Sequence, residues 1–593
     1  MSENLKMRSE VEEKYKWKIE DLVSSDKNWE ERFDILKEDI PKIQKFKGNL
    51  NISNVFECLK INEKLSREVM TLYVYANLKL NEDSTNSFYQ AMSSKADTLM
   101  SFYQGQVSFL EPEILQIDEQ ELKNALKNED YKIYSQYIGN MLRMKKHILS
   151  AKEEEILAKT YEICESASAI YNMIDNADMK YEPIEDENGK LKELTHGNFI
   201  SFMENPNRNV RKNAFKSYYK SYNYLKNTIA TTYTSSVKSD IFNAQIRNYS
   251  SSLEKALFEA DIPTKVYKNL IETVHKFLPA MHKYINIRKK RLKLDEIHFY
   301  DLYTPIVENV DKKISFEEAK EIILKALKPL GEDYIKTLEN AFENRWIDIY
   351  ENVGKRSGAY VWGAYGCHPF VSLNYANTLN SMFTLVHEMG HALHSHYTQE
   401  NQPYIYGNYT IFLAEVASTV NEALLMEYLL ETTEDEAEKT YLLNYFMEQF
   451  RTTLFRQTMF AEFEMIIHEK MEQGEPFVFE TLCEEYKKLN QKYYGQEIFI
   501  DEEISWEWAR IPHFYNAFYV YQYATGYSCA IAFSEKILKE NGAEKYLGFL
   551  KSGSSDYSIE ILKKAGVDMT TIEPIEKALK VFENLVDEMD KIS

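Results

Sequence analysis

The sequence is short of cysteine and of the residues that interrupt helices. Its 593 residues include 19 glycines and 13 prolines, and this scarcity of turn formers favours a mainly α-helical protein. The five cysteines are scattered and form no CxxC pair: Cys58, Cys164, Cys367, Cys483 and Cys529. A disulfide framework is therefore not expected, and a reducing compartment is indicated.

Long apolar runs and an excess of positive charge are also missing. No run approaches the roughly 18 apolar residues of a membrane-spanning helix, and the charged N-terminal stretch lacks the apolar core of a signal peptide. The formal net charge of −22 argues against a surface that neutralises nucleic-acid phosphates. We therefore expect a cytoplasmic protein without a membrane or nucleic-acid partner. Nothing in the sequence indicates an oligomeric state.

Helical periodicity and one hairpin signal divide the chain into three stretches. Over the N-terminal part, apolar residues recur at spacings of three and four, which is typical of amphipathic helices. The dipeptide Asn188-Gly189 lies between roughly alternating segments and predicts a β-hairpin. We predict an N-terminal helical region at 1–110, a helical region ending in the hairpin at 111–200, and a larger domain at 201–593.

A segment rich in glycine, aromatic and β-branched residues interrupts the helices of the larger domain. It predicts two short strands at about 358–363 and 369–375. Asn377 or Thr378 is then placed to cap the helix that follows. The second strand is either an edge that pairs with an extended peptide or an ordinary buried strand.

This helix carries the motif HExxH at residues 387–391. Positions i and i+4 share one helix face, so His387 and His391 can bind the same Zn²⁺ ion. Glu388 lies beside the first ligand, where its carboxylate can reach a metal-bound water. A helix with surface histidines is the alternative, and its apolar neighbours disfavour it because unpaired imidazoles are costly to bury. Those neighbours are Leu385, Val386, Met389, Ala392 and Leu393.

A catalytic zinc usually has three protein ligands and one open position. The metzincin pattern would place a glycine three residues and a third histidine six residues after His391. His394 and Tyr397 occupy those two positions, so that pattern fails. We expect one of three roles for His394: packing in the core, a hydrogen bond to a metal ligand, or contact with the substrate. His396 has no assigned role.

A carboxylate on the next predicted helix, at 411–430, is the better candidate for the third ligand. Glu415 stands between Ala414 and Val416, and a metal bond would account for a carboxylate in this apolar setting. Glu422 lies seven residues further along the same face, either as a hydrogen-bond partner of a ligand or as an ordinary polar position.

Gly390 inside the HExxH motif indicates that another part of the chain lies close to this helix. A glycine within a helix costs about 1 kcal/mol relative to alanine. The compensation is close approach of another backbone, plausibly that of the helix bearing Glu415, or packing alone.

Three segments follow one another along the chain: HEMGHALH at 387–394, FLAEVAST at 412–419 and the tyrosine-rich PHFYNAFYVYQYATG at 512–526. In this order they resemble the oligoendopeptidase F family. These zinc metallopeptidases are related to thimet oligopeptidase and neurolysin. The resemblance is strongest over about 350–570. It implies a multi-helical ellipsoid with a deep central channel and a few short strands beside the HExxH helix.

The same resemblance assigns roles at the motif. One Zn²⁺ ion per chain would be bound by His387, His391 and Glu415, and Glu388 would be the catalytic glutamate. These assignments agree with the ligand types and spacing read from the residues themselves.

The tyrosine-rich segment receives its roles only from the resemblance. His513 and Tyr521 match the family's histidine and tyrosine that hydrogen-bond the substrate and the reacting carbonyl. Their spacing is shorter than in the thimet branch, so Tyr515 and Tyr519 are kept as further substrate-binding candidates. Read alone, this segment would be a tyrosine-rich helix that fills a core or covers a surface.

We therefore predict a zinc-dependent metalloendopeptidase, a hydrolase that cleaves internal bonds of short peptides with zinc-bound water activated by Glu388. One alternative is another HExxH peptidase that trims residues from a peptide terminus. A second is a non-catalytic helical peptide-binding protein with a structural zinc. Cobalt or manganese could replace zinc in vitro.

Overall fold

The computed structural model describes residues 5–307 and 312–592, and within them the protein is mainly helical with a few very short strands. The predicted α class is confirmed. Among the helices of these described residues, none combines the length and apolarity needed to cross a bilayer. The ellipsoidal body and the channel implied by the resemblance stay predictions.

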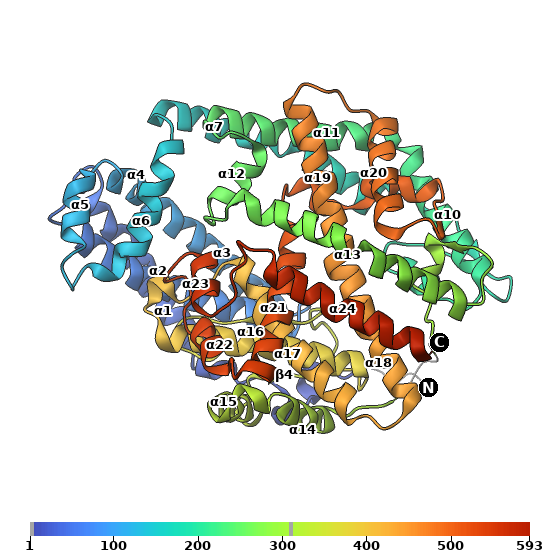
Figure 1. The fold of residues 1–593 in the computed structure, drawn as a ribbon. Coiled ribbons are helices and arrows are strands. Elements are labelled where there is room, and N and C mark those ends of the chain that lie inside the picture. The colour runs from blue at the N-terminus through green and yellow to red at the C-terminus, as the bar shows by residue number, and fades with distance from the viewer. Residues whose placement is uncertain (1–4, 308–311, 593) are drawn as a thin grey trace. The chain divides into compact units, whose positions relative to one another are not determined.

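The chain forms two compact units, each built from segments that are distant in sequence (Figure 1). Unit 1 comprises Met1–Lys146, Asp311–Tyr428 and Phe533–Gly566. Unit 2 comprises His147–Val310, Leu429–Ala532 and Val567–Ser593. The boundaries predicted at residues 110 and 200 divide the chain into consecutive stretches, whereas each unit combines distant segments. These boundaries therefore remain a prediction.

The elements that belong wholly or mainly to unit 1 are α1 (Asp26–Asp39), α2 (Val55–Glu82), α3 (Ser87–Val107), α4 (Leu110–Ile114), α5 (Glu119–Ala125), α6 (Ser135–Met144), α14 (Phe316–Ala326), α15 (Glu332–Glu343), β4 (Ile347–Asp348), β5 (Tyr360–Trp362), β6 (Phe370–Ser372), α16 (Leu379–Asn401), α17 (Ile411–Thr432), α22 (Ala543–Leu550) and α23 (Ser558–Lys564).

Those of unit 2 are α7 (Ala151–Cys164), α8 (Ser166–Met173), β1 (Ile184–Glu185), β2 (Leu191–Lys192), α9 (Phe199–Met203), α10 (Arg208–Tyr224), α11 (Lys226–Ile246), α12 (Ser252–Phe258), α13 (Thr264–Arg291), β3 (Ile297–His298), α18 (Glu436–Gln449), α19 (Arg456–Glu472), α20 (Phe479–Tyr494), β7 (Ile498–Phe499), α21 (Tyr521–Glu540) and α24 (Glu573–Ile592). The last four residues of α17 lie in unit 2, and the second part of α21 lies in unit 1.

In unit 2, the predicted hairpin is present. β1 and β2 pair antiparallel across Asn188-Gly189, and Gly189 adopts the positive φ of 73° that such a tight turn requires. Helices α13 and α24 lie side by side although they come from the middle and the end of the chain (Figure 1). A parallel pairing of β3 with β7 was not predicted, because two-residue strands leave no periodic signal in a sequence.

In unit 1, a three-stranded sheet lies against the HExxH helix. Its strand order is β4-β6-β5, and α16 contacts both β5 and β6. The two predicted strands are thus confirmed, although each is shorter than expected. β6 is the central strand, which favours the buried alternative, and β5 is an edge. Phe370 of β6 is buried in the same core as Trp17 and Trp29, which anchors the sheet to the N-terminal helices.

A buried ion cluster holds the outer strand β4 in place. The Asp348 carboxylate accepts from Lys355 Nζ at 2.7 Å and from Arg8 Nη2 at 2.5 Å. Burial alone would raise the pKa of Asp348, but Lys355 and Arg8 outweigh it and keep that pKa below its ordinary value. The cluster ties the N-terminal segment to the sheet.

We expect Asp348→Asn to destabilise the fold by about 3–5 kcal/mol, because it leaves the buried Lys355 charge without its partner. Urea-induced unfolding measures the change. Glu57→Gln is a matched control, since it breaks the exposed pair with Lys45 at 3.2 Å and should cost no more than about 1 kcal/mol. Equal effects of the two substitutions would contradict the role given to the buried cluster.

Candidate metal centre

The HExxH motif lies in the middle of α16. Thr378 caps this helix, and its side chain accepts a hydrogen bond from Ser381 N at 3.1 Å. The apolar residues that flank the two histidines are 0% exposed, so this part of the helix is buried. His387 and His391 lie one turn apart, with ring centroids separated by 4.9 Å. Both imidazoles are therefore held on one face of a rigid, buried helix.

Gly390 is the point at which α17 meets α16. A Cβ at this position would lie 2.6 Å from Ser418 Cα and 2.8 Å from Ala417 O, which is too close for any side chain. The predicted close approach of the Glu415 helix is confirmed. Ser418 Oγ in turn donates to Glu415 Oε2 at 3.2 Å. The contact at Gly390 therefore brings the carboxylate to the histidines.

The three predicted ligands converge on one point. Glu415 Oε2 lies 3.5 Å from His387 Nε2 and 3.6 Å from His391 Nε2. In a tetrahedral zinc site with bonds of about 2.0–2.1 Å, neighbouring ligand atoms are about 3.3 Å apart. The donor set and its spacing therefore fit Zn²⁺. Within the described part of the chain, no other group of three such side chains converges in this way.

Glu422 fixes the orientation of the first histidine. His387 Nδ1 lies 2.5 Å from Glu422 Oε1, so Nδ1 donates a hydrogen bond to this carboxylate and Nε2 faces the cluster. Burial lowers the pKa of His387, but Glu422 and the nearby carboxylates outweigh it and raise that pKa to about 9. Burial likewise opposes ionisation of Glu415, yet His391 and His387 bring its pKa down to about 2.

A cavity of about 720 Å³ in unit 1 contains the cluster. Strand β5, the segment after it and Tyr409 form much of its wall, together with His387, His391 and Glu415. Glu388 also lines this cavity, and burial raises the pKa of its carboxyl group. No hydrogen bond or ion pair to the Glu388 carboxylate is formed by the described residues. It can therefore accept a proton from a molecule in the cavity.

The other two histidines of α16 are packed. His394 is 0% exposed and stacks on Tyr409 at 3.7 Å, with Phe549 on another side. Its burial lowers its pKa well below the ordinary value, which keeps the ring neutral. His396 packs against Trp346 at 5.3 Å. Neither belongs to the metal cluster.

The tyrosine-rich segment belongs to unit 2 and is not one helix. It forms a short 3₁₀ turn over Pro512–Tyr515, and α21 begins only at Tyr521. His513 is exposed, and Tyr519 lies parallel to its ring at 6.1 Å. Tyr523 is 6.1 Å from His513 and 5.5 Å from Tyr519. The expectation of a continuous helix was wrong, since Phe518 has a positive φ of 59° that no helix accommodates.

The remaining predicted tyrosines pack against other tyrosine rings. The Tyr521 side chain is 2% exposed and packs on Tyr267 at 5.0 Å. Tyr515 stacks on Tyr171 at 4.3 Å, and its hydroxyl group lies 2.8 Å from Thr232 Oγ1. Tyr523 was not singled out from the sequence. Its position four residues after Tyr519, on the first turn of α21, was the available signal.

The family model of peptidase family M3 matches residues 201–581. The chain belongs to this family. A second family model, described as Oligopeptidase F, matches residues 113–181. Oligopeptidase PepF of Bacillus subtilis (strain 168) is 50% identical over 590 residues, which cover 99% of this chain and 88% of that protein.

Solved structures agree with this assignment. Oligoendopeptidase-F from Enterococcus faecium is 38% identical with a TM-score of 0.74, over 96% of this chain and 99% of that one. A protein from Chlamydophila abortus is 36% identical with a TM-score of 0.95, over 100% of both chains. The predicted oligoendopeptidase F resemblance and the metalloendopeptidase class are confirmed.

In this M3 peptidase, Gly390→Ala should separate α16 from α17 and weaken the metal cluster. We expect a lower zinc content after equilibration at limiting zinc, and a loss of about 1–3 kcal/mol in unfolding free energy. Elemental analysis and urea unfolding measure the two effects.

Gly139→Ala is the matched control, because a Cβ there meets no atom within 4 Å. Alanine at this helical position should raise the unfolding free energy by up to about 1 kcal/mol and leave the uptake of added zinc unchanged. Wild-type zinc affinity in Gly390→Ala would show that the close helix contact does not hold the ligands.

Proposed function

We propose that the protein is a cytoplasmic, zinc-dependent endopeptidase that hydrolyses internal bonds of short peptides. The convergence of His387, His391 and Glu415 at distances suited to zinc, beside the unpaired Glu388 carboxylate, is the observation that carries this proposal. The cytoplasmic location is supported by five free cysteines, as expected in a reducing compartment.

His387, His391 and Glu415 would hold the ion. Bound zinc supplies a Lewis acid that polarises the peptide carbonyl and makes water more acidic. Glu422 keeps His387 in the tautomer that presents Nε2, and Ser418 steadies the Glu415 carboxylate. These two contacts lower the cost of ordering the ligands.

Glu388 is proposed as the general base. Its carboxylate takes a proton from the attacking water as the oxygen bonds to the peptide carbonyl carbon. The same group then delivers that proton to the amide nitrogen as the C–N bond breaks, which regenerates the carboxylate. Its position on the cavity wall, without a partner among the described side chains, supports this role.

Strand β5 is proposed as the docking edge for the substrate backbone. It pairs antiparallel with β6 on one side, and its residues line the cavity that contains the ligands. An extended peptide could add to the other side through main-chain hydrogen bonds, with little dependence on side chains. This replaces the central strand β6 as the candidate edge.

Binding through a terminal carboxylate is less well supported. The described residues that line the cavity include no lysine or arginine, so a free peptide carboxylate would meet the acidic Glu388 and Glu415 instead. This favours cleavage within a peptide over trimming from its C-terminus.

His513 and a tyrosine near it are proposed to hydrogen-bond the substrate. Tyr521 and Tyr515 remain candidates from the resemblance, but their rings pack on Tyr267 and Tyr171. This favours Tyr519, whose ring lies parallel to that of the exposed His513. Tyr523 joins it as an alternative donor because it packs beside both His513 and Tyr519.

A short peptide blocked at both ends, with an internal quenched fluorophore, should be cleaved in a zinc-dependent manner. Glu388→Gln should lower kcat by about 10²–10⁴-fold while zinc content stays near one per chain. Glu415→Gln should lose zinc instead, and excess zinc should restore part of its activity. Mass spectrometry locates the cut. Cleavage only of peptides with a free terminus, or a fully active Glu388→Gln enzyme, would refute the proposal.

Three single substitutions separate the tyrosines. Tyr519→Phe or Tyr523→Phe should lower kcat by about 10²-fold if that hydroxyl group donates to the developing oxyanion. Tyr521→Phe should then leave kcat near wild type, because its ring packing is kept. Steady-state kinetics on the blocked peptide gives the answer. A loss confined to Tyr521→Phe would instead favour the assignment made from the resemblance.

A further inference from the structure

Phe518 interrupts the segment that carries His513 and Tyr519. Its φ of 59° lies in the left-handed region, which a bulky residue adopts only where its surroundings hold it. The ring is almost fully buried and packs on Tyr267 at 5.7 Å. Because Phe518 directly precedes Tyr519, its backbone conformation decides where Tyr519 lies relative to His513.

A buried carboxyl group on α19 holds this backbone. Glu464 Oε1 accepts a hydrogen bond from Phe518 N at 3.0 Å, and Glu464 is 0% exposed. Its second oxygen has no hydrogen-bond partner among the described residues. The one polar contact of this carboxyl group is therefore the strained backbone of Phe518, although burial of such a group is costly.

Burial also raises the pKa of Glu464 well above its ordinary value. This shift favours the neutral carboxyl form. A glutamine side chain reproduces the shape and the acceptor oxygen of that form.

His468, one turn further along α19, supports the same contact. Its Nδ1 lies 2.8 Å from the Glu464 carbonyl oxygen and its Nε2 lies 3.4 Å from Asp240 Oδ2. Its ring packs on Phe518 with centroids 4.5 Å apart. The hydrogen bond and the ring contact thus come from one helix and act on one residue.

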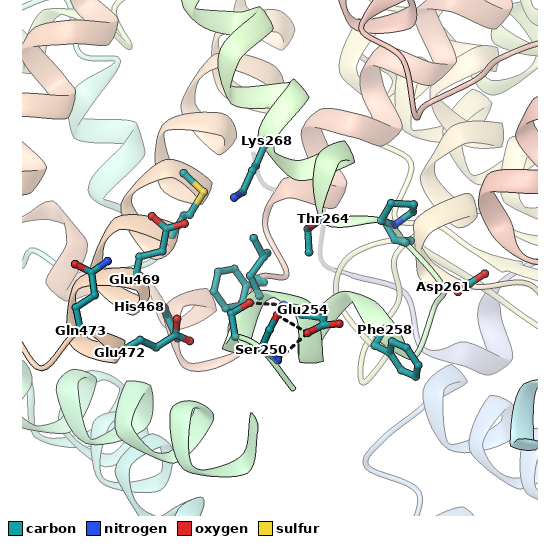
Figure 2. Close-up of a pocket in the computed structure, with 16 residues that line it drawn as sticks. Ser250, Glu254, Phe258, Asp261, Thr264, Lys268, His468, Glu469, Glu472 and Gln473 are labelled. Carbon is teal, nitrogen blue, oxygen red and sulfur yellow. Dashed lines mark hydrogen bonds between the residues drawn. The ribbon is translucent and has the colours of Figure 1, made fainter. Parts of the chain in front are cut away.

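Phe518 lies at the wall of a cavity. Phe518 and His468 line a cavity of about 790 Å³ in unit 2, bounded by α12, the start of α13 and the end of α19 (Figure 2). The ring itself is 3% exposed, so packing restrains the ring. The hydrogen bond to Glu464 adds a directional contact that restrains the backbone.

We infer that Glu464 is a positioning residue, which fixes the Phe518 backbone so that Tyr519 is held beside His513 for the reaction. This inference rests on the proposed role of His513 and Tyr519. Glu464 is not a member of the metal cluster, and it acts through the conformation of one residue.

The test compares Glu464→Met with Glu464→Gln in the full-length, zinc-loaded enzyme. Glu464→Met should lower kcat by about 10–100-fold with KM within about twofold, since small misplacements of a catalytic group carry costs of this size. Glu464→Gln should keep kcat within about threefold. Glu462→Met is the matched control: Glu462 is also buried on α19, but its partners are His275, Lys492 and Tyr493.

Amide hydrogen exchange of fragments containing Phe518 gives a readout that does not depend on activity. Exchange at this amide should be at least about tenfold faster in Glu464→Met and near wild type in Glu464→Gln and Glu462→Met. The inference would be overturned by slow exchange or unchanged kcat in Glu464→Met. An equal loss of kcat in Glu462→Met would overturn it as well.

His513→Ala and Tyr519→Phe distinguish this failure from a failure of the proposed function. If both variants are fully active, the proposed role of the segment is wrong whatever Glu464 does. If they are inactive while Glu464→Met behaves as wild type, only the positioning inference fails.

Discussion

The candidate metal centre depends on the close contact between α16 and α17 at Gly390. Two histidines on one helix supply only two ligands, and the third must come from a separate element at a fixed distance. The backbone of Ser418 occupies the space where a side chain at Gly390 would lie, so the two helix axes approach closely. Glu415 and Glu422 are thereby aligned with His391 and His387 along the shared seam.

This arrangement also explains how several carboxylates of an acidic protein can lie near one another. Glu415 and Glu422 each face an imidazole, whereas Glu388 has no such partner among the described residues. The electrostatic consequences differ accordingly: burial raises the pKa of Glu388, and the histidines hold that of Glu415 near 2. The two neighbouring carboxyl groups on this cavity thus fit the two roles proposed for them, metal ligation for Glu415 and proton transfer for Glu388.

Much of this centre was predictable because its signals are local. The HExxH spacing, the unusual Gly390 and a carboxylate in an apolar setting each express a constraint within one or two turns of helix, and all three agree with the structure. The edge position of β5 was not predictable, because strand order depends on pairing between distant segments. The prediction of a continuous helix over the tyrosine-rich segment was wrong for a similar reason, a contact with a distant part of the chain. Its spacing looked helical, whereas the break at Phe518 is imposed by a residue on another helix.

In unit 1 and in unit 2, the position of a site residue depends on the backbone at one nearby residue, but the two backbones differ. At Gly390 a side chain is absent so that two backbones can meet, and the conformation there is an ordinary helical one. At Phe518 the backbone is unfavourable, yet a glycine would be a poor replacement. It would ease the left-handed conformation but would remove the ring that packs on Tyr267 and His468 and would make the segment more flexible in every state. A strained phenylalanine restrained by Glu464 therefore specifies a single position for Tyr519, which a relaxed glycine could not do.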